Sequence, residues 1–365
     1  MSEWQTFCLK DLGKIVGGAT PSTNNPKNYG NKIAWITPKD LSTLQGRYIK
    51  KGSRSISRLG FKSCSCVLLP KHAILFSSRA PIGYVAIAKK RLCTNQGFKS
   101  IIPNKKIYFE FLYYLLKYHK DNISNIGGGT TFKEVSGATL GLFKVKIPPT
   151  YYEQQKIART LSILDQKIEN NHKINELLHT LAYKIYEYYF KYKPKNAKLE
   201  QIIIENPKSS IMVKNAQKTQ DKYPFFTSGD NILSYPKAII DGRNCFLNTG
   251  GNAGIKFYVG KASYSTDTWC ICANEFSDYL YLLLSSIKNH INQSFFQGTS
   301  LKHLQKNLLK KYPIYMPSAH EIKKFNQIIM PLLTLISINT RTSKKLEQIR
   351  DFLLPLLLKQ QVKPK

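Results

Sequence analysis

The fold is decided by three blocks of sequence, FLYYLL at residues 111–116, GTTFK at 129–133 and KIP at 146–148, which occur a second time in the chain. Their copies are YLYLLL at 279–284, GTSLK at 298–302 and YMP at 315–317, so the shift along the chain is the same to within one position. Three blocks in the same order at a nearly constant offset indicate an internal duplication.

The duplication extends weakly upstream of these blocks. AILFS at 73–77 resembles NCFLN at 244–248, and the opening LKDL at 9–12 resembles LEQI at 199–202, with a longer shift than that of the other blocks. The first copy therefore carries about twenty more residues between positions 20 and 74. The basic stretch 191–198 is interpreted as the junction between the copies.

Each copy ends in a long helical pattern. From Ile157, apolar residues recur at alternating spacings of four and three, which is typical of a coiled-coil seam, and the same steps recur from Phe325 in the second copy. Two helices of about forty residues are expected, with Pro331 kinking the second or delaying its start. Ordinary amphipathic core helices are the alternative. The predicted seam residues are Ile157, Leu161, Leu164, Ile168, Asn171, Leu178, Ile329, Leu332, Ile336, Asn339, Leu346 and Leu353.

The globular halves mix short β-rich runs with one helix each, near 108–120 and 277–290, so the predicted fold class is α+β. We expect two tandem α/β domains in a pseudo-twofold arrangement, separated by the two long helices. The predicted parts are a first domain at 1–150, a helix at 151–192, a second domain at 193–318 and a helix at 319–360.

The composition favours a nucleic-acid partner. Lys and Arg number 55 against 22 Asp and Glu, a formal charge of +33 in 365 residues. With 42% hydrophobic and 12% aromatic residues, the chain is no disordered basic tail, so folded domains carry the charge. The first residues lack the pattern of a signal peptide and no apolar run approaches membrane-spanning length, so a cytoplasmic protein without a membrane partner is expected.

The sequence offers little catalytic machinery. The seven cysteines include the pairs Cys64/Cys66 and Cys270/Cys272, whose spacing in apolar runs favours core packing over a metal site. Seven histidines show no metal-ligand spacing, and no carboxylate pair stands out. The glycine-rich run 127–133 lacks the Gly-Lys-Ser/Thr of a nucleotide-binding loop. We therefore expect a binding protein with no catalytic residues, metal or cofactor of its own.

Polar and basic loops are the candidates for DNA contact. Arg, Asn and Gln can read base edges, while Lys, Ser and Thr more often hold phosphates. For the GTTFK block and its copy, a phosphate contact and an ordinary helix N-cap remain alternatives. The candidate DNA-binding residues are Thr37, Lys39, Ser78, Arg79, Asn95, Gln96, Lys99, Thr130, Thr131, Lys133, Ser228, Asn248, Asn252, Thr266, Thr299, Ser300 and Lys302. Because the two copies differ most in these loops, they should read different sequences.

A set of short motifs resembles the specificity subunits of type I restriction-modification systems over nearly the whole chain. The motifs are GGATPS at 17–22, WITPKDL at 35–41, TNQG at 94–97, GTT at 129–131, IPP at 147–149 and EQQKI at 153–157. The second copy departs from the pattern with MPS at 316–318 and EIK at 321–323.

The resemblance implies two target-recognition domains, each reading one half of a split DNA site, with the two helices packed antiparallel as a spacer. It also implies two modification subunits that bind S-adenosylmethionine and methylate adenine, and a restriction subunit that is a motor and nuclease. None of that chemistry would lie on this chain. A stand-alone DNA-modifying enzyme and a basic coiled-coil scaffold that binds RNA or protein are the alternatives.

Overall fold

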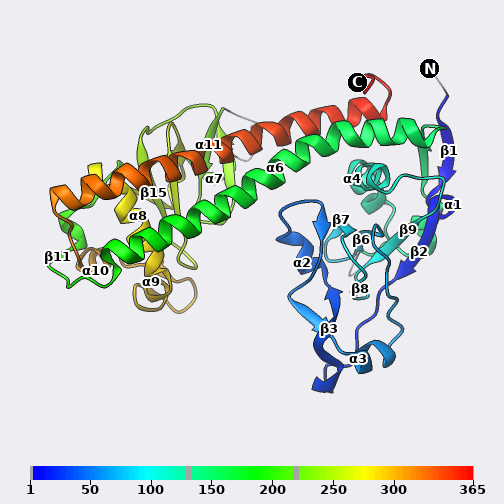
Figure 1. Cartoon of the computed structure of the whole chain (residues 1–365), viewed down its shortest axis with the longest axis horizontal. Coiled ribbons are helices and arrows are strands. Elements are labelled where there is room, and N and C mark those ends of the chain that lie inside the picture. Colours follow the sequence, from blue (N-terminus) through cyan, green and yellow to red (C-terminus); the bar gives the residue numbers. More distant parts are fainter. Residues whose placement is uncertain (1–2, 129–132, 217–221, 365) are drawn as a thin grey trace. The chain divides into compact units, whose positions relative to one another are not determined.

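The computed structural model describes residues 3–128, 133–216 and 222–364 (Figure 1). The chain forms two units: unit 1 comprises Met1–Asn170 with Ser343–Lys365, and unit 2 comprises Asn171–Thr342. The units divide inside the two long helices, whereas the sequence suggested parts that end where the helices begin. The reason is that each end of a helix packs against a globular half and belongs to its core.

Unit 1 contains a five-stranded sheet of order β2-β9-β6-β7-β4, a three-stranded sheet of order β5-β3-β8 and the pair β1-β10. Its strands are β1 (Gln5–Cys8), β2 (Gly13–Gly17), β3 (Tyr29–Ile36), β4 (Tyr48–Ile49), β5 (Arg54–Ile56), β6 (Ile74–Ser78), β7 (Ile82–Ala88), β8 (Cys93–Thr94), β9 (Lys99–Pro103) and β10 (Lys144–Ile147). Its short helices are α1 (Leu9–Leu12), α2 (Pro38–Ser42), α3 (Arg58–Lys62), α4 (Phe109–Asn125) and α5 (Gly137–Leu142).

Unit 2 contains a four-stranded sheet of order β12-β18-β15-β16, a three-stranded sheet of order β14-β13-β17 and the pairs β11-β21 and β19-β20. Its strands are β11 (Ala197–Lys198), β12 (Ile204–Glu205), β13 (Tyr223–Phe226), β14 (Ile232–Tyr235), β15 (Arg243–Asn248), β16 (Ile255–Val259), β17 (Ser263–Tyr264), β18 (Thr268–Cys272), β19 (Phe296–Gln297), β20 (His303–Leu304) and β21 (Pro313–Ile314). Its short helices are α7 (Val213–Ala216), α8 (Ser277–Ser286), α9 (Lys288–Ser294) and α10 (Lys306–Lys310).

The topology confirms the duplication. Strand orders β2-β9-β6-β7 and β12-β18-β15-β16 correspond one to one, and so do β5-β3-β8 and β14-β13-β17. The central strand of each small sheet runs parallel to one neighbour: Ile36 pairs with Thr94, and Phe226 pairs with Tyr264. Helix α4 corresponds to the broken pair α8 and α9. The mixed α and β fold class is therefore confirmed.

The extra residues of the first copy build an additional edge strand. Strand β4, at Tyr48–Ile49, pairs with β7, and within residues 171–216 and 222–342 no strand takes the equivalent place beside β16. This segment also supplies Arg47, which is buried and donates from Nε to Glu169 Oε1 (3.0 Å) and from Nη1 to Glu110 Oε1 (3.2 Å). The insertion thus connects its sheet to α4 and to the first long helix.

The two long helices are α6 (Tyr151–Tyr186), extended by a π-helical turn at Glu187–Lys191, and α11 (Ala319–Leu358), in agreement with the predicted lengths. Their starts are equivalent. Thr150 Oγ1 donates to Glu153 Oε2 (3.1 Å), and Ser318 Oγ donates to Glu321 Oε2 (3.0 Å), so each helix begins with a hydroxyl and a carboxylate three residues apart. The second copy keeps this hydrogen bond although its sequence motif differs from that of the first.

Within each unit the two helices pack antiparallel. In unit 2, Asn339 Nδ2 donates to Asn175 Oδ1 (2.9 Å), and further along α6 the rings of Phe190 and Phe325 lie 4.9 Å apart. In unit 1, Arg350 Nη1 donates to Asp165 Oδ1 (2.7 Å). In both units, residues later in α6 contact residues earlier in α11, and residues earlier in α6 contact residues later in α11, as in an antiparallel pair.

The predicted seam residues lie on the buried side of the helices to different degrees. Ile157, Leu161, Ile168, Ile329 and Ile336 are buried, and the remaining seven are partly buried. The apolar face is wider than a two-position seam because the globular halves also pack on it. Residues outside the predicted pattern that complete this face are Ala158, Ile322, Leu333, Leu354 and Leu358.

Pro331 neither delays nor interrupts the second helix, contrary to the expected delay. Helix α11 starts twelve residues earlier and runs continuously through this position. Proline removes only one backbone donor, and here it lies on an exposed face. Ile329 and Leu333, on the opposite side, are buried in the core of unit 2 and hold the helix in place.

The seven cysteines are all free thiols. Cys66, Cys93, Cys245 and Cys270 are buried among apolar side chains, and burial raises the pKa of the Cys245 thiol well above its ordinary value. Among the described residues, no group of three or more His, Cys, Asp and Glu side chains is placed to hold a metal ion.

Candidate nucleic-acid interface

The loops that the sequence singled out in the first half meet in space. The amide of Asn95 donates to Ile36 O (2.9 Å), that of Ser78 to Gly97 O (2.8 Å), and that of Val135 to Ser78 O (3.0 Å). These bonds join segments that are far apart in the sequence. We call this set, residues 37–39, 77–79, 95–99 and 133–135, the first loop cluster.

The corresponding loops of the second half meet in the same way. The amide of Ser265 donates to Phe226 O (2.9 Å) and that of Leu304 to Thr249 O (2.9 Å). The side chains add two bonds: Thr249 N donates to Ser228 Oγ (3.1 Å), and Thr249 Oγ1 donates to Asp267 O (2.7 Å). We call residues 227–229, 248–252, 265–268 and 298–304 the second loop cluster.

The same backbone bonds hold both clusters. The bond from Asn95 to Ile36 corresponds to that from Ser265 to Phe226, and the bond from Val135 to Ser78 corresponds to that from Leu304 to Thr249. The duplicated scaffold therefore presents four loops in an equivalent arrangement twice, while the side chains on these loops differ.

In the first cluster, some candidate residues build the loops and others are exposed. Ser78 is buried and donates from Oγ to Gly97 O (3.3 Å), and Asn95 Oδ1 accepts from Gly97 N (3.0 Å). Thr37 begins α2 and donates from Oγ1 to Asp40 Oδ2 (2.7 Å). Burial would raise the pKa of Asp40, but hydrogen bonds from Ser53 and Thr37 outweigh it and hold this pKa below its ordinary value.

The exposed candidates of the first cluster are Lys39, Gln96 and Lys133. Gln96 accepts a hydrogen bond at Oε1 from the Thr20 hydroxyl. Arg79 and Lys99 both contact Glu134, with Arg79 Nη1 at 3.6 Å from Oε2 and Lys99 Nζ at 3.2 Å from Oε1. Thr130 and Thr131 lie outside the described residues.

In the second cluster, Asn248 is buried and holds the loops together instead of being exposed for contact with DNA. Its Nδ2 donates to Asn252 O (3.1 Å) and its Oδ1 accepts from Lys256 Nζ (3.0 Å). Lys256 also donates to Thr227 O (2.8 Å), so one ammonium connects two of the loops. Burial lowers the pKa of Lys256 to about 8.

The other candidates of the second cluster are more accessible. Asn252, Thr299, Ser300 and Lys302 are exposed, and Ser228 and Thr266 are partly buried. Strands β19 and β20 form a hairpin whose turn contains Thr299 to Lys302, and α10 begins only at Lys306. The helix N-cap alternative is therefore wrong for this copy.

Sequence reasoning missed Glu134 and Lys256, which organise the two clusters. Each carried a weak signal. Glu134 is an acidic residue directly after a candidate basic loop, and Lys256 is a lysine inside an otherwise apolar strand, IKFYV. A charge in such a place is explained only by partners from distant segments, which no local pattern reveals.

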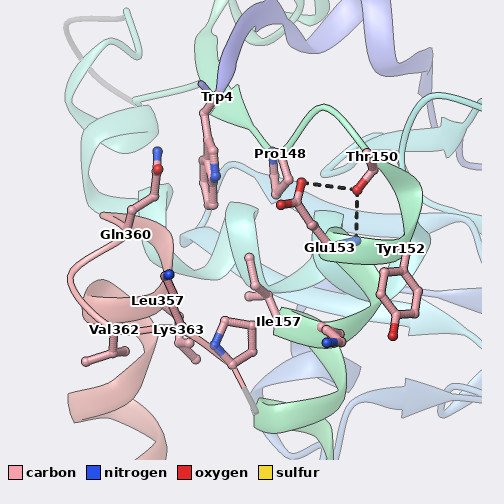
Figure 2. Close-up of a pocket in the computed structure, with 12 residues that line it drawn as sticks. Trp4, Pro148, Thr150, Tyr152, Glu153, Ile157, Leu357, Gln360, Val362 and Lys363 are labelled. Carbon is pink, nitrogen blue, oxygen red and sulfur yellow. Dashed lines mark hydrogen bonds between the residues drawn. The ribbon is translucent and has the colours of Figure 1, made fainter. Parts of the chain in front are cut away.

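Unit 1 also contains a cavity of about 510 Å³ that includes none of the candidate DNA-binding residues. Figure 2 shows Trp4 from the N-terminal segment on one side, and Leu357, Gln360, Val362 and Lys363 from the C-terminal segment on another. Glu153, which also lines it, is hydrogen-bonded to Thr150 in the cap of α6.

Within the part of the chain that the structure describes, no helix is both long enough and apolar enough to span a bilayer.

Comparison with known proteins identifies the family. The family of the type I restriction modification DNA specificity domain matches twice, at residues 1–180 and 195–348. The specificity subunit of the type I restriction enzyme MjaIX of Methanocaldococcus jannaschii is 33% identical over 98% of this chain and 93% of that protein. The HindI specificity subunit of Haemophilus influenzae is 30% identical over 46% of this chain and 37% of that protein.

A solved structure has the same fold. The type I restriction-modification S subunit of Mycoplasma genitalium matches with a TM-score of 0.65 and 18% identity, over 98% of this chain and 96% of that one. The double match of the family and the identity to a full-length relative agree with the motifs and with the duplicated topology. This chain therefore belongs to the family of type I restriction-modification specificity subunits.

Proposed function

We propose that this chain binds double-stranded DNA and reads a bipartite, asymmetric site, one half-site with each loop cluster. The observation that carries the proposal is the pair of loop clusters, which share their backbone bonds and differ in their side chains. An equivalent scaffold supports docking on two stretches of duplex, and different side chains support different base preferences.

The charge supports the same function. A formal charge of +33 favours contact with the phosphate backbone, and exposed lysines occur in both clusters, at Lys39, Lys133 and Lys302. Much of the binding free energy should therefore come from ion release, so the affinity should fall steeply as the salt concentration rises.

We further propose that the chain acts as the non-catalytic member of a complex. Its partners would be two modification subunits, which bind S-adenosylmethionine and methylate adenine, and a restriction subunit. Helix α6 exposes Ile174, Leu177 and Leu181 within unit 2, with 62% of Leu177 accessible. Exposed apolar side chains in a row on one helix are typical of a surface that a protein partner covers.

An exchange of loops tests the proposal. Residues 95–99 of the first cluster are replaced by the matching loop of a homologous specificity subunit, and methylated adenines are mapped in cells that carry the modification subunits. We expect one half-site of the methylated motif to change and the other to remain. If both half-sites change together, the assignment of one half-site to each cluster is wrong.

The same chain separates the alternatives. Methylation or cleavage of DNA by the purified chain alone would identify it as a stand-alone enzyme. Binding to duplex DNA without sequence preference, even with the modification subunits present, would favour a basic scaffold.

A further inference from the structure

We propose that Arg79 reads a guanine in the half-site of the first loop cluster, and that Glu134 is the positioning residue that sets its guanidinium for this contact. This inference rests on the proposed function and specifies a base that the proposed function leaves open. It concerns three charged side chains in unit 1, namely Arg79, Lys99 and Glu134.

The carboxylate of Glu134 contacts two cations through different oxygens. Oε2 lies 3.6 Å from Arg79 Nη1, and Oε1 lies 3.2 Å from Lys99 Nζ. The shorter contact is a charge-assisted hydrogen bond, whereas the longer one is an ion pair. Lys99 therefore hydrogen-bonds to the carboxylate, whereas Arg79 contacts it at ion-pair distance only.

Exposure distinguishes the two cations. The side chain of Arg79 is 37% exposed and that of Lys99 is 20% exposed. A guanidinium has five donors in a planar fork, and one edge can face Glu134 while another faces a ligand. The commonest specific contact of arginine in the major groove is a bidentate one to O6 and N7 of guanine. Arg79 therefore has the accessibility and the geometry of the reader.

The backbone around these side chains is fixed. Gly128 and Glu134 exchange two backbone hydrogen bonds, of 3.1 and 2.9 Å, and Val135 N donates to Ser78 O (3.0 Å). Glu134 and Arg79 are therefore the chain neighbours of Val135 and Ser78, which are hydrogen-bonded to each other. A carboxylate held in this way reduces the freedom of Arg79 before DNA binds, so less entropy is lost when the contact forms.

A net charge of one positive unit remains after Glu134 is paired with both cations. A lone carboxylate would be repelled by DNA phosphates, and Lys99 removes that penalty. Glu134 can therefore lie at the interface without weakening the binding.

The arrangement is limited to the first half. The offsets of the neighbouring blocks give Gly250 and His303 as the counterparts of Arg79 and Glu134. The counterpart of Lys99 is Trp269, because Ile101 and Ile271 pair with the equivalent residues Ile74 and Cys245. None of these can reproduce a carboxylate between two cations. The second cluster is organised instead by Lys256, which donates to Thr227 O and Asn248 Oδ1. Its half-site should not depend on the equivalent positions.

The test maps methylated adenines in the source cell after replacing the gene by variants Glu134→Gln, Arg79→Lys and, as a matched control, Lys133→Ala. Glu134→Gln keeps the size of the side chain and removes its charge, while Arg79→Lys keeps the charge and removes the fork. The half-site of the first cluster is the one that changes in the loop exchange described above. Thermal unfolding of each purified variant shows that it folds.

We expect the unaltered chain to give a first half-site that contains a guanine. In both Glu134→Gln and Arg79→Lys, methylation at sites with another base at this position should rise on the order of tenfold relative to the guanine sites. The second half-site should stay the same. Lys133→Ala should lower methylation at all sites without changing any base preference.

Several outcomes would overturn the inference while leaving the proposed function intact. They are a first half-site without a G·C pair, unchanged base preferences in both variants, a change confined to the second half-site, or complete loss of methylation by a folded Glu134→Gln chain. If the unaltered gene directs no methylated motif at all, the proposed function fails, and this inference fails with it.

Discussion

The two units place different chemistry at the same position of the same fold. In unit 1, Arg350 donates to Asp165 Oδ1 (2.7 Å) and Tyr114 OH donates to Asp165 Oδ2 (2.6 Å), both within the packed core of helices α4, α6 and α11. The equivalent positions of unit 2 follow from matching Phe111 with Tyr279 and Ile157 with Phe325. Leu333 then stands in place of Asp165, Leu282 in place of Tyr114 and Ala182 in place of Arg350. All three unit 2 residues are buried.

This comparison separates what the fold needs from what it tolerates. A buried ion pair with a tyrosine and a set of three apolar side chains support the same antiparallel helices, so the pair is not required for the architecture. Both charged residues of the pair must nevertheless be replaced together, because a buried charge without its partner lowers stability. The three residues of each unit therefore act as one set.

The largest effect is expected from breaking this set in unit 1. Asp165→Leu alone should lower the free energy of unfolding by about 2–3 kcal/mol, because Tyr114 loses its acceptor and the largely buried Arg350 is left with the exposed Asp351. The triple variant Tyr114→Leu, Asp165→Leu, Arg350→Ala reproduces the unit 2 set and should lie within about 1 kcal/mol of the unaltered chain. Urea unfolding measures both. A triple variant as unstable as the single one would show that the two sets are not interchangeable.

Lys256, which organises the second loop cluster, should make stability depend on pH. Lys256 has a pKa near 8 in the folded chain against an ordinary value of 10.5, because burial disfavours its charge. Unfolding then takes up a proton between these two values, so the contribution of Lys256 to stability rises with pH across this range.

Comparison with Lys256→Met isolates this contribution. The free energy of unfolding of the unaltered chain should rise relative to that of the variant by about 1–2 kcal/mol between pH 7 and pH 10, with allowance for partial solvent screening. Cysteines and tyrosines titrate in both chains and cancel in the difference. A difference that does not change with pH would mean that Lys256 is not held as a buried cation.

The exposed lysines of the two clusters should behave alike. Lys133→Ala and Lys302→Ala should each weaken binding to all duplexes by a similar, few-fold factor. Each should also reduce the slope of log affinity against log salt concentration by about one. Binding to matched and mismatched duplexes over a series of salt concentrations measures this. A change in base preference for either variant would rule out a phosphate contact.

The smallest effect should come from the helix starts. Glu321 accepts from Ser318 and Tyr315 and forms an ion pair with Lys193, and these contacts hold its pKa at about 2. This stability is complete above the ordinary value of 4.5 and is lost as the pH falls toward 2.

Glu321→Gln should cost about 0.5 kcal/mol at pH 7, because the group is solvent-exposed, and nothing near pH 2. Glu153→Gln at the start of α6 is the matched variant, and comparison of the two costs shows how much the contact between Lys193 and Glu321 contributes. Thermal unfolding at both pH values measures this. An equal cost at pH 2 and pH 7 would show that the charge of Glu321 does not contribute.

Much of the fold could be predicted because its signals are periodic or repeated. The steps of four and three from Ile157 and Phe325 predicted both long helices, and the constant offsets predicted two equivalent halves. The insertion before residue 74 was visible as a change in offset, and the structure shows that it forms the edge strand β4.

The site could be predicted only at the level of loops. Residue type and turn pattern selected the candidate loops, and the structure brings these loops together, but the candidate residues differ in burial. Asn248 and Ser78 are buried and bond to the backbone, which no turn-like pattern distinguishes from exposure. Glu134 and Lys256 were missed because their partners come from segments that are distant in the sequence.

A genome-wide map of methylated adenine in the source cell, with and without this gene, measures whether this chain determines the methylated site. Deletion should remove methylation at one split motif, with two unlike half-sites at a fixed interval, and restoring the gene should return it. Methylation of a continuous motif, or a split motif that persists after deletion, would contradict it.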